Sequence, residues 1–161
     1  MADQQVLYMD EVRKGNYMVF VEHVLAQIPS AFKIGSLDIK LLSEYRDYLL
    51  SIGDELAETY CTIMSTANID FFKGGECVGL ISGYWRDLIT DVDKNEYWVR
   101  IGIYMLKLFS ANVGVAALIA LPMQLVSLAT SRIEKDKRLD GQVIITLGKL
   151  SILTAVFYAE M

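Results

Sequence analysis

The feature that most constrains this chain is a run without any charged side chain, from Leu108 to Ser131 between Lys107 and Arg132. Its 24 residues are enough to cross a bilayer, because a spanning helix needs about 20 apolar residues. However, small and polar residues interrupt the run, and Pro122 near its middle would remove a helical hydrogen bond. Basic residues stand on both sides, so the flanks set no orientation. We therefore expect a buried helix of a soluble protein, with almost no water-exposed face and no membrane insertion.

The composition suits one domain over residues 1–161 that does not bind nucleic acid. Of the 161 residues, 53% are hydrophobic and 22% charged, and the net charge is −5. An acidic protein is a poor partner for a phosphate backbone. The N-terminus lacks the basic and apolar stretches of a secretory signal, so we expect a cytoplasmic location. The apolar neighbours of Cys61 and Cys77 favour two reduced core cysteines over a disulfide or a metal site.

Apolar residues recur at helical spacing along most of the chain, and no segment alternates as a strand would. Ser36 is a plausible N-cap. We expect an all-α fold of about seven or eight helices. We expect them at about residues 4–14, 17–28, 36–52, 54–64, 75–89 and 96–109, along the uncharged run to 132, and at 139–159.

Three glycines, Gly75, Gly79 and Gly83, share one face of the helix expected at 75–89. Each glycine inside a helix costs about 1 kcal/mol relative to alanine, so three together suggest a compensating contact. The spacing favours a second helix that passes unusually close, and the close approach of a ligand is the alternative.

The sequence carries no motif for catalysis or metal binding. His23 is the only histidine, and no nucleophile elbow, phosphate-binding loop or metal-ligand spacing is present. A structural or surface role for His23 is favoured. The acidic turn 91–95 resembles the start of a calcium loop, but Glu96 stands where that loop needs glycine. We therefore expect a protein that is not an enzyme and holds no metal.

Arg100 is a lone charge among large apolar residues such as Trp98 and Tyr104. Its guanidinium could pair with a structural acid or reach solvent along its stem. It could instead hold an anionic ligand through bidentate hydrogen bonds. The residues alone favour the structural role. Arg86, which follows Tyr84 and Trp85, has the same alternatives.

Several short motifs together resemble a sensor globin, the family that includes bacterial globin-coupled sensors. Residues 54–60 (DELAETY) resemble the family's second helix, and Phe72 its aromatic after the next loop. Residues 85–88 (WRDL) resemble the end of the distal helix, and 100–102 (RIG) match the start of the proximal signature Arg-Ile-Gly-x-x-His. The resemblance covers about residues 37–160. It implies a globin-like fold with an added N-terminal helical segment over 1–35.

The chain departs from the signature at the residue that would bind haem. The proximal histidine position holds Met105, and its neighbour is Tyr104. Met or Tyr can ligate haem iron, so a haem-based gas sensor with one of these axial ligands is an alternative. A protein-interaction module similar to the stressosome sensor globins is another. A pocket without its histidine favours a ligand other than haem, or no ligand.

Within the haem-free branch, the chain is most similar to the small sporulation-inhibitory sensor-domain proteins of spore-forming bacteria. That resemblance implies an apolar tunnel for a fatty acid in the former haem cavity, with an arginine and a chloride ion at the carboxylate. It also implies a homodimer through the last two helices. The implied role is to sequester a signal from a sporulation histidine kinase and so inhibit sporulation.

The resemblance also assigns candidate residues to this tunnel. Arg100 is the first candidate for the carboxylate and Arg86 the second. The candidates for the lining are Tyr60, Phe72, Ile81, Ile101, Tyr104, Met105 and Leu118. Ordinary core packing is the alternative for each of these apolar residues.

Overall fold

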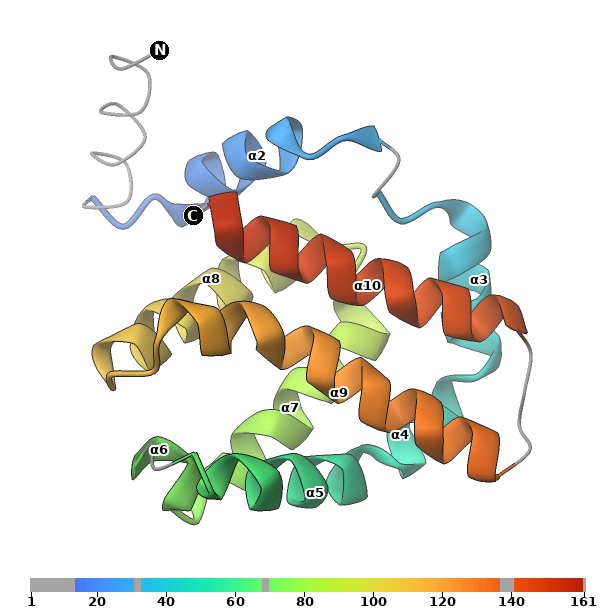
Figure 1. Ribbon diagram of the computed structural model, residues 1–161. Coiled ribbons are helices and arrows are strands. Elements are labelled where there is room, and N and C mark those ends of the chain that lie inside the picture. Colours follow the sequence, from blue (N-terminus) through green and yellow to red (C-terminus); the bar gives the residue numbers. More distant parts are fainter. Residues whose placement is uncertain (1–13, 31–32, 68–69, 137–140, 161) are drawn as a thin grey trace.

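The computed structural model (Figure 1) describes residues 14–30, 33–67, 70–136 and 141–160, and the regular structure in these ranges is entirely helical. The all-α expectation is therefore confirmed. The helix expected at 4–14 lies almost wholly outside the described residues. The described helices are α2 (Tyr17–Gln27), α3 (Ser36–Glu44), α4 (Arg46–Ser51), α5 (Gly53–Ser65), α6 (Asp70–Lys73), α7 (Glu76–Asp91), α8 (Asn95–Ser110), α9 (Val115–Lys135) and α10 (Gly141–Glu160).

The segment expected as one helix over 36–52 is divided in two. α3 ends at Glu44 and α4 begins at Arg46. Ser36 was expected to be the N-cap, but it is the first helical residue, and Gly35 holds the cap position. The Asp38 carboxylate accepts the Gly35 N–H at 2.9 Å. The side chain of the third helical residue therefore accepts the amide of the N-cap residue, as in one half of a capping box.

The uncharged run is not a single helix. α8 continues to Ser110, and α9 begins at Val115. Between them Asn112 has φ of +63°, in the left-handed region that asparagine tolerates better than most residues. Pro122 lies within α9 and is buried.

The expectation that this helix has almost no water-exposed face is wrong for the single chain. One side of α9 is buried through Leu118, Leu121 and Leu125, while Met123 is 52% exposed. Its other exposed residues include Gln124, Ser127 and Ser131. Up to Ser131, the water-exposed face of this helix thus consists of uncharged residues. The distribution of charges in the sequence therefore did not reveal it. Within the described chain, one segment, 116–135, is long and apolar enough to cross a membrane.

The helices pack in pairs around one apolar core. α9 and α10 run antiparallel, side by side, across the front of the view in Figure 1, while α5 packs on α7 and α2 on α8. Two buried indoles fix the core. The Trp85 N–H donates to the Leu49 carbonyl at 2.7 Å, and the Trp98 N–H to the Val92 carbonyl at 3.1 Å.

The close helix contact expected at Gly75, Gly79 and Gly83 is not found in the described structure. A Cβ atom added at Gly75 or Gly79 would meet no atom within 4 Å. At Gly83 it would meet a side-chain nitrogen of Arg86, one turn along the same helix, at 3.6 Å. The close approach lies elsewhere, at Gly53 of α5, where a Cβ would stand 2.9 Å from Cδ1 of Trp85.

A buried polar contact joins α3 to α10. Asp38, only 5% exposed, accepts hydrogen bonds from the Thr146 hydroxyl at 2.7 Å and from Lys149 at 3.2 Å. Together with the Gly35 amide, these donors satisfy a carboxylate that would otherwise be costly to bury.

A second polar network holds the C-terminal end of α9. Asp136 accepts hydrogen bonds from Tyr48 of α4 at 2.8 Å and from Arg132 at 3.0 Å, and Arg132 also pairs with Glu55 of α5. Arg132 and Asp136 together therefore join the end of α9 to α5 and α4.

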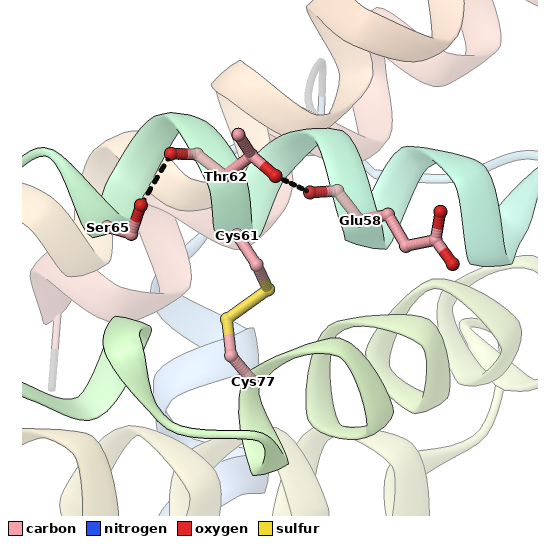
Figure 2. Close-up of a disulfide and its surroundings, with 5 residues drawn as sticks. All are labelled: Glu58, Cys61, Thr62, Ser65 and Cys77. Carbon is pink, nitrogen blue, oxygen red and sulfur yellow. Dashed lines mark hydrogen bonds between the residues drawn. A yellow bond between two sulfur atoms is a disulfide. The ribbon is translucent and has the colours of Figure 1, made fainter.

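Cys61 and Cys77 form a disulfide, so the expectation of two reduced cysteines is wrong. Figure 2 shows the sulfur bridge between α5 and the start of α7, with Thr62 and Ser65 bonded back along α5. The two residues are 16 apart in sequence, yet their Cα atoms are 6.1 Å apart. They meet because α5 and α7 pack together around the short α6.

Candidate functional site

A cleft of about 440 Å³ opens between α2, the segment before α3, the α7–α8 turn and α10. Ligand pockets in proteins commonly span roughly 300–1,000 Å³. Most of the lining is apolar: Leu25, Ala26, Ile28, Ile34, Val92, Trp98 and Leu153. The polar part of the lining consists of Glu22, Lys33, Asp93 and Asn95.

The apolar wall of the cleft is held firmly by the core behind it. Trp98 is 3% exposed, and its ring packs against Phe157 with centroids 4.9 Å apart. Because its N–H already donates to Val92, the indole offers the cleft ring surface rather than a hydrogen bond. Ile28 and Leu153 are also buried. The wall is therefore suited to contact a hydrocarbon group.

The polar residues of the cleft carry charges of both signs. Glu22 lies on α2, Asp93 in the α7–α8 turn and Lys33 in the segment before α3, and all three are exposed. Among the described residues that line the cleft, Lys33 alone is basic. No ion pair joins these three groups in the described part of the chain. All three charges therefore remain accessible to a molecule in the cleft.

The structure does not bring Arg100 or Arg86 to this cleft. Arg100 donates to Asp91 at 3.0 Å, and its Nε lies 3.8 Å from Asp87. The pKa of Asp91 falls below its ordinary value because Lys94 and then Arg100 bond to its carboxylate. Arg100 thus pairs with structural acids, the role that the residues alone favoured. Arg86 is exposed on α7.

The residues expected to line a tunnel belong to the core between α5 and α9. Tyr60, Phe72, Ile81, Ile101 and Leu118 are buried, and Tyr104 and Met105 are partly buried against the same core. Tyr60 and Phe72 meet edge to face, with ring centroids 5.9 Å apart. Burial, and then the neighbouring Tyr84, raise the pKa of Tyr60 far above its ordinary value. None of the seven residues lines the described cleft.

Sequence reasoning missed the charged residues of the cleft. Glu22, Lys33 and Asp93 come from three separate segments, and no local motif links them. Trp98 was noticed only as an apolar neighbour of Arg100. The one available signal was the apolar pattern of residues 18–28, which does not specify the partner surface.

The site carries no arrangement that identifies a known chemistry. In the described part of the chain, no group of three or more His, Cys, Asp or Glu side chains is placed to hold a metal ion. Comparison of the chain with family models, with curated proteins and with solved structures found no match.

Proposed function

We propose that this protein is a non-enzymatic, homodimeric sensor domain with a globin-like fold that binds a long-chain fatty acid. By sequestering this ligand it would withhold a signal from a sporulation histidine kinase and so inhibit sporulation. The cleft of about 440 Å³ carries the proposal. Apolar walls with a few polar groups are the usual form of a small-molecule site, and they suit a hydrocarbon chain with a polar head. The cleft thus offers a ligand position separate from the core residues expected at a former haem cavity.

The pairing of the helices supports the globin-like part of the proposal. Globins pack their helices pairwise around a single pocket. Here α5 packs on α7 and α9 on α10, and α5 also packs against α9. Met105, at the position of the proximal histidine in the resemblance, is partly buried against the core that these helices share.

An apolar surface over α9 and α10 supports the homodimer. Met123, Ile145 and Ile152 are 52%, 53% and 43% exposed, and their two helices lie side by side (Figure 1). Contiguous exposed apolar patches mark interaction sites. From Val115 to Ser131 α9 has no charged residue, and Lys149 of α10 bonds to Asp38. Two copies, each of charge −5, could meet here with little repulsion. A stressosome-type interaction module would use the same surface.

The dimer is tested by placing a charge on this surface. We expect Ile145→Lys to convert the protein to a monomer in sedimentation velocity, because a lysine buried in the proposed apolar interface must lose its hydration. Ile63→Lys is the matched control, since Ile63 is 51% exposed but lies on α5. A wild-type protein that stays monomeric at high concentration would refute the homodimer.

The ligand is tested by native mass spectrometry of the purified full chain. We expect a protein mass that exceeds the sequence mass by that of a fatty acid, and release of this ligand by organic extraction. Protein freed of ligand should bind added hexadecanoic acid again. A ligand-free mass in every preparation, together with no affinity for hexadecanoic acid, would refute the fatty-acid function.

The proposed location is the cytoplasm, where a sporulation histidine kinase would present its sensor domain. The Cys61–Cys77 disulfide bears directly on this location. Stable disulfides are rare in reducing cytosol and common in exported proteins. If the disulfide persists in cells quenched with acid, it would argue for an oxidising compartment.

A further inference from the structure

The charged residues that line the cleft indicate which kind of head group a bound ligand would carry. Glu22 and Asp93 contribute two negative charges, and Lys33 contributes one positive charge. All three side chains are exposed, and no ion pair joins them in the described structure. Charges that border a binding site act on the head group of the ligand and select among head groups by complementarity.

A simple carboxylate is a poor match for this set of charges. It would pair with Lys33, but Glu22 and Asp93 line the same cleft and would repel it. A simple cation would pair with the two acids and face Lys33. A head group with one negative and one positive centre can pair with both kinds of residue at once, and it adds no net charge to an acidic protein.

The size and the walls of the cleft define the rest of the ligand. Leu25 and Ile34, which are only partly buried, would leave apolar surface in contact with water if a small polar zwitterion bound alone. A volume of about 440 Å³ is near the lower end of the range for ligand pockets. It therefore suits one hydrocarbon chain better than two.

We infer that the cleft binds a single-chain zwitterionic amphiphile more tightly than a fatty acid of the same chain length. This inference rests on the proposed function, because it takes the binding of a fatty-acid chain in the cleft as given and proposes that a zwitterionic head group on such a chain binds more tightly than a carboxylate. Lys33 would bind the negative centre of the head group, and Glu22 with Asp93 the positive centre.

The test compares four ligands that share a dodecyl chain and differ in head group: dodecylphosphocholine, dodecanoate, dodecyltrimethylammonium and 1-dodecanol. Each is titrated below its micelle concentration into the full chain by calorimetry, and tryptophan fluorescence, to which Trp98 at the cleft contributes, gives a second readout. We expect dodecylphosphocholine to bind at least about tenfold more tightly than dodecanoate.

Variants at the cleft separate the roles of the charges. Combined Glu22→Gln and Asp93→Asn should weaken dodecylphosphocholine and strengthen dodecanoate, each by about threefold or more. Lys33→Met should weaken both of these ligands and strengthen dodecyltrimethylammonium. Lys40→Met on α3 removes an exposed cation away from the cleft and should change none of the affinities. Binding of 1-dodecanol should not respond to any of these variants.

Two outcomes overturn the inference while leaving the proposed function intact. One is tighter or equal binding of dodecanoate by the wild-type chain. The other is an unchanged order of affinities in the Glu22 and Asp93 double variant. If none of the four ligands binds while hexadecanoic acid does, the inference alone fails; if hexadecanoic acid does not bind either, the proposed function fails with it. Since the substituted residues are exposed, unchanged thermal unfolding of each variant confirms that the fold is intact.

Discussion

The contact of Asp38 with α10 allows the contribution of a buried carboxylate to be measured. Its oxygens accept hydrogen bonds from the Gly35 amide at 2.9 Å, the Thr146 hydroxyl at 2.7 Å and the Lys149 ammonium at 3.2 Å. Asp38→Ala would remove all three bonds, while Asp38→Asn would keep one acceptor oxygen and remove the charge. The two variants therefore separate hydrogen bonding from charge.

The structure sets the expected size of each effect. A hydrogen bond to a charged group contributes about 1.5–3 kcal/mol, and this range applies to the bond from Thr146, which is 1% exposed. Loss of the cap at Gly35 adds about 1 kcal/mol. The Lys149 side chain is 40% exposed, so its ion pair adds less than about 1 kcal/mol. We expect Asp38→Ala to lower the free energy of unfolding by about 3–4 kcal/mol, and Asp38→Asn by about 1–2 kcal/mol.

The pH dependence gives an independent check of the same contact. Burial raises the pKa of Asp38, but the bonds from Gly35, Thr146 and Lys149 lower it more, so the pKa in the folded protein lies below its ordinary value. A depressed pKa means that the ionised carboxylate stabilises the fold above the unfolded pKa of about 3.9. This contribution is lost as the pH falls through the folded pKa. The advantage of wild type over Asp38→Asn should therefore shrink below about pH 4.

The assay is urea unfolding followed by far-UV circular dichroism at a series of pH values. Thr146→Val serves as the control, because it removes one donor and leaves the charge of Asp38 in place. A cost below about 1 kcal/mol for Asp38→Ala would refute the reasoning. So would an Asp38→Asn cost that is the same at neutral and strongly acidic pH, since the charge would then contribute nothing.

Two further predictions concern the α5–α7 contact. Replacing Cys61 and Cys77 by Ala should lower the free energy of unfolding by about 3 kcal/mol, the entropy of closing a loop of this length. Urea unfolding checks this, and equal stability of oxidised and reduced wild type would contradict it. Gly53→Ala should destabilise by about 1–3 kcal/mol, because its Cβ would crowd Trp85. Gly79→Ala, with open space around its Cβ, should instead stabilise by about 1 kcal/mol. Thermal unfolding compares the two glycine variants, and a shift of the same sign in both would be inconsistent with the packing.

The helices could be predicted from the sequence because an apolar face repeats at helical spacing whatever it packs against. The helix expected at 75–89 is observed as Glu76–Asp91, for example, and the one expected at 96–109 as Asn95–Ser110. A helix end near Phe109 was expected, and α8 ends at Ser110, but the turn that breaks the run before Val115 was not specified, because it depends on the backbone of Asn112. Asparagine also occurs within helices, so its presence alone did not mark the break.

Contacts between distant segments could not be predicted from the sequence. Nothing local to Cys61 or Cys77 shows that α5 and α7 bring them together. The structural role of Arg100 was the favoured alternative, but the sequence did not show that Asp87 and Asp91 would be its partners. The cleft could not be predicted, since its charges come from three segments that only the packed fold brings together.

The disulfide also determines how the protein would behave after proteolytic cleavage between Cys61 and Cys77. Residues 61–77 form a covalently closed ring that contains α6. Lys73 is exposed at the end of that helix, and cleavage after it would leave the two halves of the protein joined through sulfur. Such a nicked molecule would migrate as one species until a reducing agent separated it into two. A sample that looks intact without reductant can therefore already be cut within this ring.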